Sequence, residues 1–209
     1  MTAWNDTTAG HVCIKVCGVR TEGDIDAAME AGAHAVGLVL AEGSPRQIDL
    51  ATATRLAAHC GTAITPVCLL VNPPADALRD LPTRWLQLHG DESDACIAAV
   101  AQDHLIIKAV PAMDAATLQR IDANGDIARL LVDAPSGGSG DVFDHTPFAA
   151  VRASLSTPLL VAGGLTPETV STAIAQLHPW GVDVSSGVER ERGTKDAGLI
   201  AAFCAAVRA

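Results

Sequence analysis

Short apolar runs alternate along the chain with alanine-rich segments that carry scattered charges. The apolar runs hold Val, Leu or Ile at most positions, which is typical of strands that are covered on both faces. They predict eight strands, at 12–17, 35–40, 66–71, 84–88, 105–109, 128–132, 158–162 and 180–184. The remaining segments predict eight helices, at 22–31, 49–59, 74–80, 92–102, 114–122, 146–153, 167–177 and 196–207.

Three segments carry signals for the start of a helix. The sequence TEGD at 21–24 resembles a capping box, in which the first and fourth residues bond each other's backbone N–H groups. Asp91 is placed to cap a helix that begins at Glu92. Pro167 follows Thr166 and suits the first position of a helix.

The order of these elements predicts the fold. Strict alternation of strands and helices indicates a parallel sheet. A doubly wound open sheet usually has about five or six strands and a glycine-rich first turn, whereas a (β/α)8 barrel has eight strands. Because 209 residues hold eight strand–helix units, we predict one α/β domain, a (β/α)8 TIM barrel over residues 12–209. Residues 1–11 are expected to form an N-terminal extension.

Charge narrows the possible partners. The chain has 24 acidic and 14 basic residues, which gives a formal net charge of −10. Nucleic acids and anionic membranes bind clustered Lys and Arg, so we expect neither as a partner. No apolar stretch approaches the roughly 18 residues of a membrane span. A small anionic substrate is still compatible, because a local site can oppose the overall charge.

The cysteines indicate a reducing compartment. Six stand at positions 13, 17, 60, 68, 96 and 204, without a CxxC pair. The N-terminus MTAWNDTTAG has neither a basic start nor an apolar core, so we expect no signal peptide. Free thiols in the cytoplasm are the simplest interpretation. Cys13 and Cys17 alone do not complete a zinc site, and we expect no metal.

Polar residues and glycines collect where the predicted strands end. In a (β/α)8 barrel the carboxyl ends of the strands meet at one face, which carries the active site. The residues at these ends are Cys17, Arg46, Asn72, His89, Lys108, Asp133, Gly163, Gly164, Ser185, Ser186 and Gly187.

Cys17 ends the first predicted strand. Because side chains alternate along a strand, Cys13, Lys15 and Cys17 share one face, and Ile14 and Val16 share the other. We expect the aliphatic pair to face the helices and the other three to point into the barrel. A buried, inert cysteine is the commonest case. A thiol at the barrel mouth can instead act as a base, with Lys15 favouring its thiolate.

Asp133 and the glycine loops suggest further chemistry. A carboxylate at a barrel mouth is costly to bury, so Asp133 is a helix cap, a partner of Lys108 or a catalytic group. The loops AGGLT and SSGVE follow the last two predicted strands, where such barrels often bind phosphate. Arg46 can hold a carboxylate in a two-pronged contact, and His89 can orient its own loop. The set suits proton transfer on a phosphorylated small molecule and includes no cofactor motif.

The same motifs occur together in a known family. KVCGVR, GLVLAEGSPRQI, LQLHGDE, IIKAV, LLVDAPSGGSGDVFD, PLLVAGGLTPETV and GVDVSSGVERERGTKD follow one another from residue 15 to 196. This set resembles the phosphoribosylanthranilate isomerases of tryptophan biosynthesis, over nearly the whole chain beyond its first dozen residues. The resemblance implies a TIM barrel that converts N-(5-phosphoribosyl)anthranilate to 1-(2-carboxyphenylamino)-1-deoxyribulose 5-phosphate. It implies no cofactor.

The resemblance also implies roles for single residues. Asp133 would be the general acid that protonates the ring oxygen and opens the furanose, and Cys17 the general base that removes the C2 proton. Arg46 would bind the anthranilate carboxylate, with His89 and Asp183 as further substrate contacts. The phosphate would lie against Gly163, Gly164, Ser186 and Gly187. Whether the chain is a monomer or a homodimer stays open.

Two alternatives are open from the sequence. Indole-glycerol-phosphate synthase and the histidine-pathway aldose isomerase are also phosphate-binding barrels, although the latter is expected to have a carboxylate where Cys17 stands. A non-catalytic barrel that binds a phosphorylated metabolite would need the phosphate loops but not Cys17 and Asp133 together.

Overall fold

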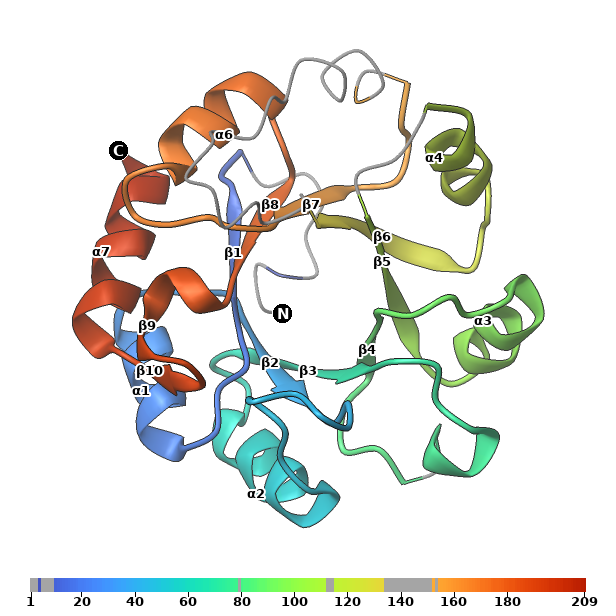
Figure 1. The fold of residues 1–209 in the computed structure, drawn as a ribbon, viewed down its shortest axis with the longest axis horizontal. Coiled ribbons are helices and arrows are strands. Elements are labelled where there is room, and N and C mark those ends of the chain that lie inside the picture. Colours follow the sequence, from blue (N-terminus) through green and yellow to red (C-terminus); the bar gives the residue numbers. More distant parts are fainter. Residues whose placement is uncertain (1–3, 5–9, 79, 112–114, 134–151, 153) are drawn as a thin grey trace.

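The chain folds into a closed barrel of eight parallel strands (Figure 1). The computed structural model describes residue 4 and residues 10–78, 80–111, 115–133, 152 and 154–209. The strands are β1 (Cys13–Cys17), β2 (Ala35–Val39), β3 (Thr65–Leu70), β4 (Trp85–Leu88), β5 (Leu105–Pro111), β6 (Ile127–Asp133), β7 (Leu159–Ala162) and β8 (Gly181–Val184). Strand β8 closes the barrel by pairing with β1. The predicted (β/α)8 fold is confirmed.

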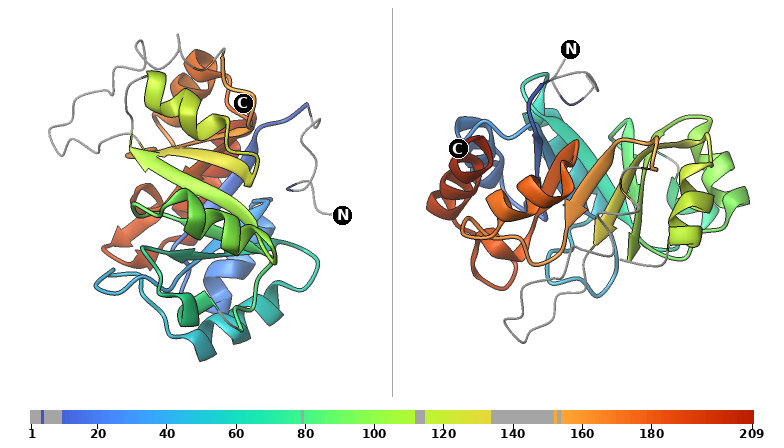
Figure 2. Two further views of the ribbon diagram at one scale, coloured as in Figure 1. Left: turned by 90° about the vertical axis from the view of Figure 1, so that its right-hand side faces the viewer. Right: turned by 90° about the horizontal axis from the view of Figure 1, so that it is seen from above.

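Helices surround the barrel (Figure 1). They are α1 (Glu22–Glu30), α2 (Leu50–Cys60), α3 (Asp94–Ala101), α4 (Ala115–Asp122), α6 (Val170–Leu177) and α7 (Ala197–Arg208), with short 3₁₀ helices η2 (Ala75–Leu78) and η3 (Ser186–Val188). A small hairpin of β9 (Glu189–Glu191) and β10 (Thr194–Lys195) precedes α7. In Figure 2, this hairpin (red) and the start of β1 (blue) lie at opposite ends of the barrel. No described helix is long and apolar enough to cross a membrane.

Of the predicted helix starts, the structure confirms one and contradicts another. The capping box is confirmed: Thr21 Oγ1 accepts from the Asp24 N–H at 3.1 Å, and Asp24 Oδ2 accepts from the Thr21 N–H at 3.1 Å. The cap at Asp91 is wrong, because Ser93 caps α3.

Other helix bounds also differ from prediction. The chain turns through Pro167 before α6 begins at Val170. The helix expected at 74–80 is only the short η2. The helix expected at 146–153 lies almost entirely outside the described residues.

The alternation predicted for β1 is confirmed. Ile14 and Val16 are fully buried in the apolar layer between barrel and helices, which also holds Ile25 of α1 and Phe203 of α7. Cys13 packs in a separate cluster inside the barrel. One face of β1 therefore packs against the helices, and the other face can place polar side chains inside the barrel.

A cluster of aromatic side chains fills the amino end of the barrel. Trp4 is fully buried, and its ring meets those of Trp85 and Trp180 edge to face, with centroids 6.0 and 5.0 Å apart. The guanidinium of Arg129 lies 4.4 Å from the Trp180 ring centroid, within the range of a cation–π contact. Trp4, from the expected extension, thus packs against the barrel at the end opposite the strand carboxyl ends.

Candidate active site

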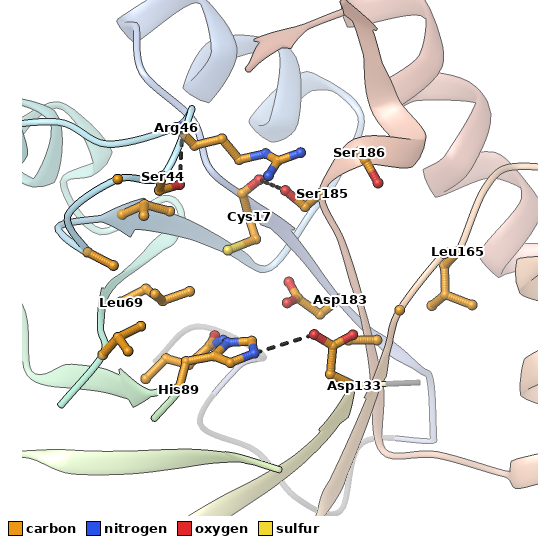
Figure 3. Close-up of a pocket in the computed structure, with 18 of the residues that line it drawn as sticks. Cys17, Ser44, Arg46, Leu69, His89, Asp133, Leu165, Asp183, Ser185 and Ser186 are labelled. Atoms are coloured by element: carbon orange, nitrogen blue, oxygen red, sulfur yellow. Dashed lines mark hydrogen bonds and ion pairs between the residues drawn. The ribbon is translucent and has the colours of Figure 1, made fainter. Parts of the chain in front are cut away.

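A cavity of about 480 Å³ opens at the carboxyl ends of the strands (Figure 3). The structure brings eight of the nine predicted site residues to its wall: Cys17, Arg46, His89, Asp133, Gly163, Gly164, Asp183 and Ser186. Apolar side chains also line it: Val39, Ala41, Leu69, Val71 and Leu165. The cavity therefore combines polar groups with apolar surface.

Cys17 ends β1 and lies almost buried in the cavity wall. Its side chain packs against Val39 and Leu69. Gly37 on the neighbouring strand makes room for the thiol, since a Cβ there would lie 2.6 Å from Sγ. Burial raises the pKa of Cys17 above its ordinary value, and the positive charge of Lys15 offsets only part of that rise. Lys15 thus favours the thiolate, as expected, but burial outweighs it and the pKa of Cys17 remains raised.

Lys15 also pairs with Asp183. Its Nζ donates to Oδ1 of Asp183 at 2.9 Å, and both side chains are buried inside the barrel. Burial alone would lower the pKa of Lys15, but the charges of Asp183 and Cys17 raise it above its ordinary value. Burial raises the pKa of Asp183, Lys15 opposes this, and the nearby Asp133 adds to the rise. Asp183 thus lines the cavity with its Oδ1 already hydrogen-bonded to Lys15.

Asp133 ends β6 and faces His89, which follows β4. Nε2 of His89 lies 3.3 Å from Oδ2 of Asp133, as drawn in Figure 3. Nδ1 of the same ring lies 3.0 Å from Nε2 of Gln87. With the Gln87 amide assigned as the donor, the ring proton is on Nε2 and points toward Asp133. His89 therefore orients the Asp133 carboxylate in the cavity.

Lys108 is not the partner of Asp133. Its Nζ donates to Oε2 of Glu92 at 2.7 Å and to the carbonyl of Gly90 at 2.6 Å. Glu92 also accepts from the backbone N–H of Asn72 at 3.0 Å. This network joins the loops that follow β3 and β4. The predicted salt bridge between Asp133 and Lys108 is wrong, because Lys108 pairs with Glu92.

Two glycine-bearing loops follow β7 and β8. Gly163 and Gly164 have φ of 89° and 63°, a region that favours glycine. The 3₁₀ helix η3 begins at Ser186, directly after the β8 loop. Gly187 is not part of the cavity wall. A Cβ there would lie 1.9 Å from the carbonyl oxygen of Leu165, so its lack of a side chain lets the two loops pack together.

Arg46 reaches the cavity from the loop after β2 and is held by Glu189 at the start of β9. Its Nε and Nη2 donate to Oε1 and Oε2 of Glu189 at 2.6 and 2.9 Å. Glu189 also accepts from Nζ of Lys195 at 2.8 Å and from the Gly193 N–H at 3.1 Å. Sequence reasoning did not find Glu189 or Lys195, although both lie in the quoted segment GVERERGTKD.

Among the described residues, no group of three or more His, Cys, Asp or Glu side chains is placed to hold a metal ion. Cys13 and Cys17 form no disulfide. They belong to different clusters inside the barrel, Cys13 with Trp4 and Trp85, and Cys17 with Val39 and Leu69. The titratable side chains that line the cavity include Cys17, His89, Asp133 and Asp183.

The fold and the cavity define a (β/α)8 barrel with a thiol and several carboxylates at its mouth. The family model described as N-(5'phosphoribosyl)anthranilate (PRA) isomerase matches residues 14–206. The chain belongs to this family, as its motifs indicated.

Known proteins are similar over nearly the full length. An N-(5'-phosphoribosyl)anthranilate isomerase from Methylibium petroleiphilum is 40% identical, with 93% of each chain covered. One from Chromohalobacter salexigens is 41% identical with the same coverage. The crystal structure of phosphoribosyl anthranilate isomerase from Thermotoga maritima is 32% identical, with a TM-score of 0.86, and covers 94% of this chain and 98% of its own.

A further structure shows a relative with a bound ligand. It is a phosphoribosyl anthranilate isomerase in complex with reduced 1-(o-carboxyphenylamino)-1-deoxyribulose 5-phosphate. It is 30% identical to this chain, with a TM-score of 0.84, and covers 94% of this chain and 98% of its own.

Proposed function

We propose that the chain isomerises N-(5'-phosphoribosyl)anthranilate, in tryptophan biosynthesis, with Asp133 as general acid and Cys17 as general base. The family assignment carries the reaction. One structural observation supports these two roles: the Cys17 thiol and the Asp133 carboxylate line the same cavity, from β1 and β6. As a thiolate Cys17 can accept a proton, and as a carboxylic acid Asp133 can donate one, which is what an aldose–ketose rearrangement requires.

Asp133 would act first. It would protonate the ring oxygen of the ribose, so that the furanose opens and the C1–N bond becomes an iminium. His89 holds the Asp133 carboxylate at 3.3 Å and would keep it oriented toward that oxygen. The proton leaves the carboxylic acid and appears on the C4 hydroxyl of the opened sugar.

Cys17 would act second. Its thiolate would remove the C2 proton, and the electron pair of the C–H bond would neutralise the iminium to give an enolamine. The enolamine then tautomerises to the ketone. Burial raises the pKa of Cys17, and the positive charge of the iminium would oppose that rise while the substrate is bound. The base would therefore be most effective when it faces the opened substrate.

The rest of the cavity suits the two ends of this substrate. The phosphate would lie at the Gly163–Gly164 loop and the start of η3 at Ser186, where backbone N–H groups and a positive helix end favour anions. Gly187 would support this loop from behind. The anthranilate ring would lie on the apolar wall around Leu69, with its carboxylate on Arg46.

We also propose a cytoplasmic enzyme that acts on a phosphorylated small molecule, with no nucleic acid or membrane as partner. The excess of acidic residues supports this. A structure of monomers derived from a dimeric relative from Thermotoga maritima is similar to this chain, at 29% identity. Both the monomer and the homodimer remain candidates for this chain.

The reaction is tested by mixing the purified protein with freshly made N-(5'-phosphoribosyl)anthranilate and following the decay of its fluorescence. We expect turnover with this substrate and little with the histidine-pathway aminoaldose. Binding of the substrate without conversion would overturn the proposal and would favour a non-catalytic binding protein.

A further inference from the structure

The side-chain carboxylate of Glu189 is the centre of a buried polar network beside the cavity. It is 4% exposed and accepts four hydrogen bonds, two from Arg46, one from Lys195 and one from the Gly193 backbone. Arg46 and Glu189 are 143 residues apart in the sequence. These four hydrogen bonds offset the free-energy cost of burying the carboxylate, and the loss of any one partner would destabilise the fold.

The way Glu189 holds Arg46 leaves the other side of the guanidinium available. Glu189 takes the side-on pair of donors, Nε and Nη2. A guanidinium has five N–H groups, so the end-on pair formed by Nη1 and the second hydrogen of Nη2 is left for another acceptor. Among the described residues, Nη1 has no hydrogen-bond partner. Arg46 lines the cavity and its side chain is 20% exposed, which suits a two-pronged contact with a ligand carboxylate.

Lys195 preserves the positive charge of this network. The pair Arg46–Glu189 alone would be neutral and would attract an anionic ligand weakly. Lys195 Nζ lies 2.8 Å from Glu189, and its side chain is 1% exposed. With Lys195 included, the three side chains carry a net charge of +1, directed toward the cavity by Arg46. The network therefore fixes Arg46 without neutralising its attraction for a carboxylate.

Close backbone contacts support the same geometry. A Cβ at Gly18 would lie 2.4 Å from Cδ of Arg46, so the arginine lies directly on the loop that follows β1. Gly193 has φ of 84°, and a Cβ there would lie 2.6 Å from the carbonyl oxygen of Pro45. Glycines at both positions thus let the β9–β10 hairpin and the β2 loop enclose the Arg46 side chain.

The network also reaches the strand that carries Cys17. Lys195 Nζ donates to the carbonyl oxygen of Ser185 at 2.9 Å. Ser185 Oγ donates to the carbonyl oxygen of Cys17 at 3.1 Å. Figure 3 shows Arg46, Ser185 and Cys17 together on one side of the cavity. The position of the arginine is therefore linked to that of the thiol through the loop after β8.

We infer that Glu189 is a positioning residue for substrate binding: it holds Arg46 by one edge so that the opposite edge receives the anthranilate carboxylate. Lys195 acts with Glu189 by keeping the net charge of the three side chains positive. The inference rests on the proposed role of Arg46 and extends it to two residues of the β9–β10 hairpin. The competing explanation is that the ion pair only stabilises the hairpin.

The two explanations differ in which ligand is affected. The probes are reduced 1-(o-carboxyphenylamino)-1-deoxyribulose 5-phosphate and the matching phenylamino compound without the carboxylate. Their dissociation constants are measured by calorimetry for the wild type, Glu189→Gln, Arg46→Ala and the double variant. Glu191→Gln, an exposed glutamate on the same strand, is the matched control. Circular dichroism confirms that each variant is folded.

For Glu189→Gln we expect at least 10-fold weaker binding of the carboxylated probe and less than 2-fold change for the other. Arg46→Ala should show the same selective loss, and the double variant little more, because the two residues act as one unit. Glu191→Gln should match the wild type. Glu189→Asp keeps the charge but shortens the side chain, and should lie between wild type and Glu189→Gln. It carries the test if Glu189→Gln does not fold.

Two results would overturn the inference, each in a recognisable way. Removing a negative charge raises the net charge of the network, so a purely electrostatic or structural role predicts equal or tighter binding of the carboxylated probe to Glu189→Gln. That result, together with a selective loss in Arg46→Ala, would overturn the role of Glu189 alone. If Arg46→Ala weakens both probes equally or neither, the proposed carboxylate contact itself is wrong.

Discussion

Nζ of Lys15 lies 2.9 Å from Oδ1 of Asp183 inside the barrel, next to the thiol of Cys17. The pair is almost wholly removed from bulk water, since Lys15 is fully buried and Asp183 is 7% exposed. Removing either partner would leave the other as an uncompensated buried charge, which is strongly destabilising. The thiol therefore lies close to a positive and a negative charge, and its ionisation depends on both of them as well as on its own burial.

The role of Cys17 is tested by comparing it with Cys13 on the same strand. We expect Cys17→Ala to lower kcat by about 10²–10⁴-fold, the usual loss when a general base is removed. Cys13→Ala should retain kcat and lose stability, because Cys13 is fully buried away from the cavity. Steady-state kinetics and urea unfolding of both variants provide the measurement. Near-normal turnover of Cys17→Ala would remove the residue from the mechanism.

The ionisation of Cys17 gives a pH dependence whose sign is fixed. Because the pKa of Cys17 is raised, the thiolate is scarce at neutral pH, and kcat/KM should rise as the pH increases above 7. The same rise should appear in the rate of alkylation of Cys17 by iodoacetamide, measured in a variant without the other cysteines. A thiol that is already fully reactive at pH 6 would contradict this assignment.

Asp183 should control this titration. Its charge raises the pKa of Cys17, whereas that of Lys15 lowers it. In Asp183→Asn the pKa of the thiol should therefore fall, and alkylation should reach half its maximum rate at a lower pH than in the wild type. Lys15→Met should move that midpoint to a higher pH. Shifts in the same direction for both variants would indicate a general disturbance of the barrel rather than these two charges.

The sequence predicted those features that depend on local patterns. The alternation of Cys13, Lys15 and Cys17 with Ile14 and Val16 was enough to orient β1, because the two-residue period is a property of any strand. Eight apolar runs separated by predicted helices indicated the barrel, and the residues at the ends of these runs indicated the cavity wall. The pairing of Arg46 with Glu189 could not be predicted, since it joins loops after β2 and β8 that only the closed barrel brings together.

The state of the thiol could not be predicted either. Lys15 lies two residues from Cys17, which suggested a thiolate. The structure shows that Asp183, from the far end of the chain, binds this lysine, and that burial outweighs its effect. A balance between burial and opposing charges is set by the three-dimensional surroundings, which a local sequence does not contain.

Asp133 and His89 should differ in what their loss does. Asp133→Asn keeps the size of the side chain but cannot supply the same proton, so kcat should fall by about 10²-fold or more with substrate affinity largely retained. His89→Gln removes the ring that holds Asp133 at 3.3 Å and should have a smaller effect on kcat. Kinetics and thermal unfolding should be measured on the same samples. A less stable Asn variant with normal kcat would show that Asp133 is structural.

Trp4 should contribute to stability and not to catalysis. Its ring is fully buried against Trp85 and Trp180 at the amino end of the barrel, far from the cavity. Replacing a buried Trp with Ala typically costs about 3–5 kcal/mol, so Trp4→Ala should unfold at clearly lower urea with unchanged kcat. Trp4→Phe should recover much of the loss. Unchanged unfolding of the Ala variant would show that this contact contributes no stability.

Glu189 should make the folded state sensitive to acid. Burial alone would raise its pKa, but hydrogen bonds from Arg46, Lys195 and Gly193 lower the pKa to about 2. A carboxylate with a lowered pKa stabilises the fold above its ordinary pKa near 4.5, and this stabilisation is lost as the pH falls toward 2.

The wild type should therefore exceed Glu189→Gln in free energy of unfolding by about 1–2 kcal/mol at pH 7, a value reduced for solvent screening at the hairpin. The difference should be constant from pH 7 to about 5 and should shrink between pH 4.5 and 2, because protonated glutamate and glutamine then make similar contacts. Urea unfolding of both proteins across this range measures it. Carboxylates elsewhere titrate in both proteins and cancel, so a difference that stays constant down to pH 2.5 would mean that Arg46 and Lys195 do not hold Glu189 in its charged form.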